Sequence, residues 1–126
     1  MSEPVPVPAL LTLYGIANCD TVRRARAWLA ANGIKAVFHD FKKAGLSPAL
    51  VKRWSDAVGW ETLVNRKGTT WRTLPQARQA QIMNADAAQA LMLEFPSIVK
   101  RPVLALGTQV IVGFDAARYR MLFETP

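Results

Sequence analysis

The chain has 126 residues, of which 51% are hydrophobic and 20% charged, and its formal net charge is +7 at pH 7. This composition excludes an intrinsically disordered chain, and the length suits a single domain. No apolar run approaches the roughly 20 residues of a membrane-spanning helix, and the N-terminus lacks the features of a secretory signal. We therefore expect a cytoplasmic protein without a membrane partner. Its basic residues occur as scattered short pairs, which favour anionic ligands but do not predict direct nucleic-acid binding.

Cys19 is the one cysteine of the chain. A single thiol can neither close an intramolecular disulfide nor build a zinc site from cysteines. We expect no metal, and any disulfide chemistry must take its second sulfur from another molecule.

The predicted elements begin after a proline-rich, flexible tail at residues 1–10. A strand is expected at 11–15, followed by a helix that is opened by residues 18–20 and stops at Gly33. A second strand is expected at 36–41. Strand, helix and strand in this order predict two parallel neighbouring strands with a right-handed crossover.

The middle of the chain is helical by pattern. Four helices are predicted, at 48–58, 60–64, 75–83 and 85–95, with a polar loop at 65–70. Two strands, at 103–106 and 110–112, then flank Gly107 and Thr108, a pair suited to a type II′ hairpin turn. A closing helix is predicted from Asp115 to Phe123.

The order βαβ, helices, ββα predicts an α/β fold of the thioredoxin-like type. Residues 11–126 are expected to form one domain, with a helical insertion at about 46–95 between the two halves of the sheet.

Cys19 lies where the first strand hands over to the first helix, at the carboxyl end of a parallel strand, which is where open α/β sheets place their sites. Unpaired amides and the helix dipole at this point stabilise a thiolate. The alternative is a small buried hydrophobic side chain, which describes most lone cysteines. The polar neighbours of Cys19 favour the reactive interpretation. His39, on the second strand, is expected to be structural rather than a general base.

Three motifs resemble the arsenate reductase-like (ArsC/Spx/MgsR) family and look most similar to its YffB-like branch. They are YGIANCDTVRRA at 14–25, NRKGTTWR at 65–72 and KRP at 100–102. The resemblance runs from about residue 11 to residue 123. It implies that Cys19 is the catalytic cysteine and that glutathione is the co-substrate, with no cofactor bound.

The resemblance also implies the residues around the thiol. Arg66 takes the position of the insertion-loop arginine, Arg101 that of the arginine before the proline, and Pro102 that of the family's cis-proline. Guanidinium groups hydrogen-bond oxyanions and lower the pKa of a nearby thiol. Arg23 and Asn18 are further candidates for binding an oxyanion or glutathione. The sequence leaves the isomer at Pro102 open.

Two departures from the family pattern limit the function. Arsenate reductases of the family carry a third arginine beyond the last strand, where residues 110–114 read VIVGF. Spx regulators pair their cysteine with another three residues on, where this chain has Val22. The sequence therefore predicts a glutathione-dependent thiol-disulfide oxidoreductase that uses the Cys19 thiolate. The alternatives are an Spx-like regulator that binds RNA polymerase and a true arsenate reductase.

Overall fold

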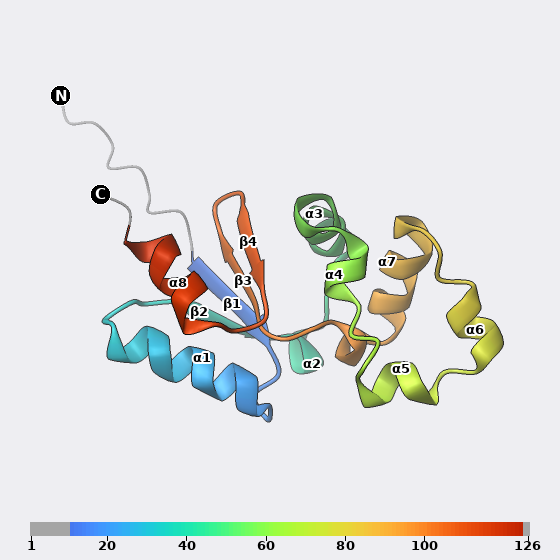
Figure 1. Cartoon of the computed structure of the whole chain (residues 1–126), viewed down its shortest axis with the longest axis horizontal. Coiled ribbons are helices and arrows are strands. Elements are labelled where there is room, and N and C mark those ends of the chain that lie inside the picture. The colour runs from blue at the N-terminus through green and yellow to red at the C-terminus, as the bar shows by residue number, and fades with distance from the viewer. Residues whose placement is uncertain (1–10, 125–126) are drawn as a thin grey trace. The chain divides into compact units, whose positions relative to one another are not determined.

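The computed structural model describes residues 11–124, so the tail predicted at 1–10 lies outside the described residues. The chain separates into two compact units (Figure 1). Of the described residues, the first unit contains 11–40 and 101–124, and the second contains 41–100. The second unit thus interrupts the first between two of its strands.

The first unit contains a four-stranded sheet, in the order β2-β1-β3-β4. Its strands are β1 (Leu11–Gly15), β2 (Val37–Asp40), β3 (Val103–Leu106) and β4 (Gln109–Val112), and its helices are α1 (Asp20–Ala31) and α8 (Ala116–Phe123). β1 pairs in parallel with β2 and antiparallel with β3, and β3 pairs antiparallel with β4. This arrangement confirms the predicted α/β, thioredoxin-like fold.

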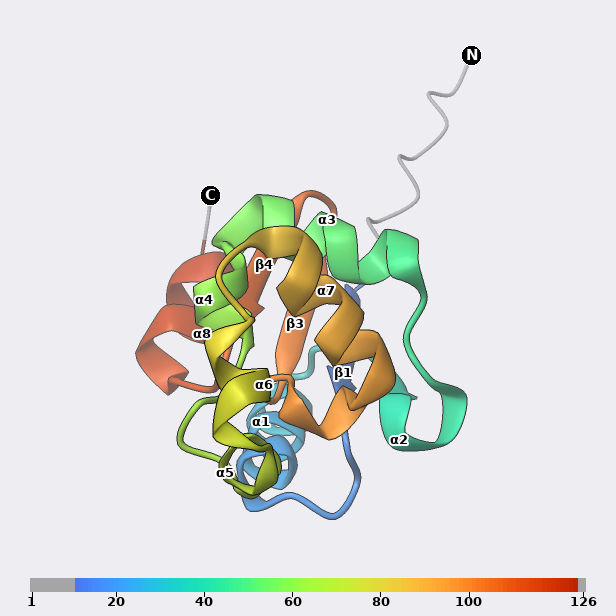
Figure 2. The same cartoon turned by 90° about the vertical axis from the view of Figure 1, so that its right-hand side faces the viewer.

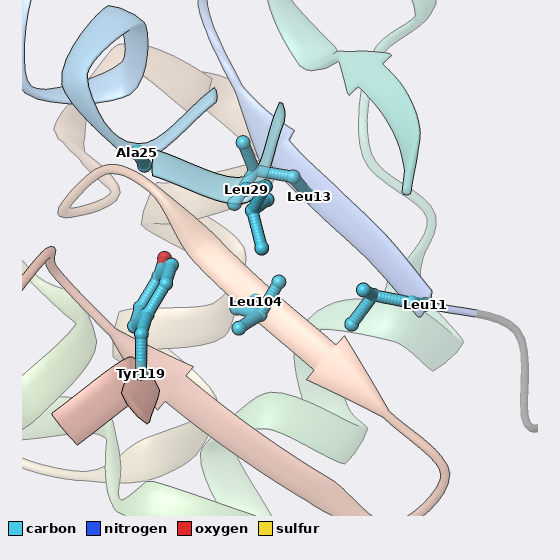
Figure 3. Close-up of a cluster of buried hydrophobic side chains, with 6 residues drawn as sticks. All are labelled: Leu11, Leu13, Ala25, Leu29, Leu104 and Tyr119. Atoms are coloured by element: carbon cyan, nitrogen blue, oxygen red, sulfur yellow. The ribbon is translucent and has the colours of Figure 1, made fainter. Parts of the chain in front are cut away.

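The core of the first unit lies where α1 and α8 pack on the sheet, as Figure 3 shows. Its buried members are Leu11, Leu13, Ala25, Leu29, Leu104 and Tyr119. Leucines alternate along β1 because successive side chains of a strand point to opposite faces, and Ala25 and Leu29 lie one helical turn apart on α1. The hydrophobic periodicity read from the sequence therefore corresponds to one continuous apolar layer.

The hairpin between β3 and β4 turns at Gly107 and Thr108. Gly107 has a φ of 61°, whereas no non-glycine residue of the described chain has a positive φ. A positive φ at the first central position only is the requirement of the predicted type II′ turn.

The second unit is entirely helical apart from one isolated β-bridge. Its helices are α2 (Phe41–Ala44), α3 (Pro48–Val58), α4 (Trp60–Leu63), α5 (Thr69–Thr73), α6 (Gln76–Ala80), α7 (Ala85–Glu94) and the 3₁₀ helix η1 (Pro96–Ile98). α3, α4 and α7 pack together (Figure 2). Ser47 and Asn84 begin α3 and α7, since each side chain accepts a hydrogen bond from an amide of the first turn.

Several boundaries differ from the sequence prediction, and three of the differences are the most informative. Phe41 begins α2 instead of ending β2, and its side chain is fully buried. The polar loop predicted at 65–70 runs into α5, which is held by a hydrogen bond of 2.8 Å from the Gln79 side chain to the Trp71 carbonyl. The helix predicted at 75–83 ends at Ala80. Tertiary contacts outweigh weak local preferences in each short segment.

No helix within residues 11–124 combines the length and the apolar character needed to cross a lipid bilayer.

Candidate active site

Cys19 is the N-cap residue of α1, directly after the loop that leaves β1. Its backbone is extended, with φ −144° and ψ 124°, and its carbonyl accepts the first helical hydrogen bond from the Arg23 amide at 2.9 Å. The side chain is half-buried. An N-cap side chain faces the unpaired amides of the first turn, so the sulfur lies where a helix binds an anion.

The loop that carries Cys19 is held at both ends. The Ala17 amide donates to the Asp40 carboxylate at 3.3 Å, which ties the loop to the end of β2. At the end of β1, a Cβ added to Gly15 would lie 2.8 Å from a methyl group of Val22. Only a glycine at this position lets α1 approach the strand so closely.

Arg101 reaches the same place from the other half of the first unit. Tyr14 near the end of β1 is the register partner of Val103 at the start of β3, so the residues before β3 lie beside the loop after β1. The Arg101–Pro102 peptide bond is cis. The Pro102 carbonyl accepts a hydrogen bond from the Gly113 amide at 2.8 Å, which anchors this segment to the residue after β4.

The surroundings of Cys19 lower the pKa of its thiol below the ordinary value. Partial burial alone would raise this pKa, but it is outweighed by the Val22 amide, by a hydrogen bond and positive charge from Arg101, and by the Thr21 amide. The Cys19 side chain makes no capping hydrogen bond. Ionisation turns a weak acceptor into a strong one, so these donors stabilise the thiolate selectively.

Arg23 lies across the residues that flank Cys19. Its guanidinium donates to the Asp20 carboxylate at 2.5 Å and to the Asn18 side-chain oxygen at 2.8 Å. The side chains of Arg23 and Asn18, both predicted to bind an oxyanion or glutathione, are therefore hydrogen-bonded to each other. These bonds use two of the five N–H donors of the guanidinium, so Arg23 keeps donors for a carboxylate while Asp20 offsets its charge.

Arg66 belongs to the second unit, where it is exposed and its guanidinium lies 5.2 Å from the centre of the Trp60 ring. Arg66 lies within a tight turn in which the Asn65 side chain accepts a hydrogen bond from the Lys67 amide at 3.2 Å. The Asn65 amide donates to the Ile98 carbonyl at 2.9 Å. The motif at 65–72 thus has a defined local structure, and the contact of Arg66 with a ligand stays a prediction.

Comparison with known proteins assigns the family. A model of the ArsC family matches residues 14–122. The chain belongs to the ArsC family.

Similar solved structures cover almost the whole of this ArsC-family chain. The structure of a protein named YFFB (PA3664) is 42% identical, with a TM-score of 0.85, over 88% of this chain and 96% of that one. An arsenate reductase (ArsC) related protein from Brucella melitensis is 46% identical, with a TM-score of 0.72, over 92% and 96% of the two chains.

A further relative is similar in sequence. The global transcriptional regulator Spx 1 of Lactococcus lactis is 21% identical over 113 residues, which are 88% of this chain and 87% of that protein.

Asp40 is the site residue that sequence reasoning missed in this ArsC-family chain. Its position at the carboxyl end of β2, beside the end of β1, is the signal that could have found it. His39, its neighbour, packs its ring 5.1 Å from that of Tyr14. Among residues 11–124, no group of three or more His, Cys, Asp or Glu side chains gathers as a metal site requires.

Proposed function

We propose that this ArsC-family protein reduces glutathionylated thiols or related disulfides through the Cys19 thiolate, with glutathione as the co-substrate. The observation that carries the proposal is the pairing of Cys19 with Arg101 at the N-terminus of α1, which lowers the pKa of the thiol. The thiolate is the nucleophile of thiol-disulfide exchange, and a lowered pKa raises the fraction of a half-exposed thiol that is ionised.

The reaction proceeds in two exchanges. The Cys19 thiolate attacks the glutathione sulfur of a mixed disulfide, which forms a Cys19–glutathione disulfide and releases the substrate as a thiolate that takes a proton from water. A glutathione thiolate then attacks the glutathione sulfur of this adduct, which restores the Cys19 thiolate and releases oxidised glutathione. Overall, one glutathione thiol exchanges with the mixed disulfide: the substrate leaves as a thiol, and the glutathione taken from it leaves joined to the added glutathione as one disulfide. A chain with one cysteine needs this external second thiol.

The surrounding residues bind the co-substrate in this proposal. Arg101 stabilises the negative charge on the Cys19 sulfur before the first exchange and after the second. Pro102, the next residue, holds Arg101 beside the thiolate. Arg66, with Arg23 and Asn18, holds the carboxylates of glutathione, because a guanidinium binds a carboxylate through two parallel hydrogen bonds.

The test is incubation with oxidised glutathione followed by mass spectrometry of the intact protein. One glutathione adduct is expected on Cys19, and reduced glutathione should remove it. Turnover of a glutathionylated peptide, measured with glutathione, glutathione reductase and NADPH, should be lost in Cys19→Ser. The proposal fails if Cys19 reacts no faster than a model thiol near neutral pH.

A second candidate function is that of an Spx-like regulator that binds RNA polymerase. The similarity to the Spx 1 regulator of Lactococcus lactis favours it. Capture of the polymerase α-subunit by wild type and by Cys19→Ser alike would support this candidate. Turnover of arsenate with glutathione and glutaredoxin would instead support arsenate reduction.

A further inference from the structure

A groove of about 580 Å³ lies between α1 and the edge of the sheet in the first unit. Leu13 and Leu29 form its buried floor, and the half-buried side chains of Ile34 and Phe38 form its walls. β2, which carries Phe38, has a strand neighbour on one side only in the described sheet. Partly exposed apolar side chains thus line a hollow at a sheet edge, above a floor that is almost fully buried, and an apolar hollow accepts apolar side chains of a partner.

The rim of the groove is positively charged. Arg26 and Lys35 are the charged residues among the described side chains that line it. The guanidinium of Arg26 lies 4.1 Å from the centre of the Phe38 ring, which holds a cation above the apolar wall. The groove therefore combines an apolar floor with a cationic rim.

A second hollow of about 320 Å³ adjoins the groove, because Ile34 lines both. Trp28 and Phe123 supply its aromatic surface, and Arg120 and Glu124 are its charged residues. Together the two hollows form one continuous surface. Its charged residues are the cations Arg26, Lys35 and Arg120 and the acid Glu124.

The geometry points to the groove and its adjoining hollow as the docking site of an acidic segment of a partner protein that inserts bulky apolar side chains. Charge complementarity selects this occupant. A second copy of this chain, with its net charge of +7, would bring like charge to a cationic rim.

The docking site is separate from the candidate active site. Cys19 begins α1, whereas Arg26, Leu29 and Ala30 of the groove lie on the second half of the same helix. At a rise of about 1.5 Å per residue, Cys19 is about 10 Å along the helix from Arg26, the nearest groove residue of α1, and about 16 Å from Ala30. Cys19 lines neither hollow, and this inference holds whether or not the proposed reaction occurs.

The test uses the full chain and a short fluorescein-labelled peptide in which glutamates flank a leucine and a phenylalanine. Fluorescence anisotropy should show saturable binding that weakens as salt is raised. The amide resonances that shift on titration should belong to residues 26–38 and the end of α8. Peptides with glutamine for glutamate, or serine for the two apolar residues, should each bind about tenfold more weakly.

The matched variants separate a local site from the overall charge. Arg26→Glu/Lys35→Glu should weaken binding about tenfold, while Arg53→Glu/Arg72→Glu, which makes the same change of net charge at exposed positions of the second unit, should change it less than about twofold. Equal effects of the two double variants would overturn the proposal. A wild-type dimer that dissociates on the substitution Ile34→Ser would also overturn the proposal, because a second copy would then occupy the groove. Laurate that shifts the same amide resonances and binds more tightly than the peptide would overturn it as well.

Discussion

Arg101 lowers the pKa of the Cys19 thiol through its guanidinium, although the two residues lie in opposite halves of the first unit's sequence. The antiparallel pairing of β1 with β3 brings them together, because the end of one strand meets the start of the other. The pKa of this thiol is therefore lowered by two groups: the backbone amides at the N-terminus of α1, which are close in the sequence, and the charge of Arg101, which is distant in the sequence.

Replacing Arg101 with alanine should raise the pKa of Cys19, because the substitution removes both a hydrogen bond and a positive charge from the thiolate. The rate of alkylation by iodoacetamide near neutral pH should fall about threefold or more. A rate profile against pH measures both effects. Arg24→Ala is the control, since Arg24 is an exposed residue of the same helix. An unchanged profile for Arg101→Ala would show that the helix N-terminus alone activates the thiol.

Stability should depend on the ionisation of Cys19. Its pKa is lower in the folded chain than in the unfolded chain, so the thiolate contributes stability above the unfolded value, about 8.5, and this is lost as pH falls through the folded value. The free energy of unfolding in urea, measured for wild type and for Cys19→Ser, should show a difference that grows with pH. Serine is itself a good N-cap, so the substitution adds a constant to the difference in unfolding free energy but does not change its dependence on pH. A difference that is flat in pH contradicts the lowered pKa.

Gly15→Ala should destabilise the protein by about 1–3 kcal/mol, because the new methyl group would overlap the buried side chain of Val22. The first turn of α1 must then move, and alkylation of Cys19 should slow. Thermal unfolding and alkylation kinetics measure the two effects. In the background of Val22→Ala, the same glycine substitution should cost much less, and strict additivity of the two changes would argue against the contact.

Tyr119→Phe should leave stability unchanged or raise it by up to about 1 kcal/mol. The Tyr119 hydroxyl is buried and has no hydrogen-bond partner among the described residues, and burial raises its pKa. Figure 3 shows the hydroxyl directed toward α1, while the ring packs edge-on to Trp28 and Phe114. Phenylalanine keeps these ring contacts and removes the desolvated group. A clear loss of stability in chemical denaturation would mean that the hydroxyl is satisfied.

The elements of the first unit were predictable because each has a local cause. The apolar steps from Val22 to Leu29 predict α1, and Gly107 predicts the hairpin. The short helices of the second unit were less predictable. α5 and α6 have too few residues for a periodic signal, and a contact such as that of Gln79 with the Trp71 carbonyl joins two separate short helices, which no single helical pattern predicts.

The sequence by itself determined that Cys19 lies at a junction between a strand and a helix. The strand pattern, the polar turn and the start of the helix occur in consecutive segments between residues 11 and 25. Only the tertiary structure decided which groups surround that thiol. Asp40 holds the loop and Arg101 lowers the pKa of Cys19 because parallel and antiparallel strand pairing set their positions. Strand pairing depends on contacts between residues far apart in the chain, and local sequence patterns carry little information about them.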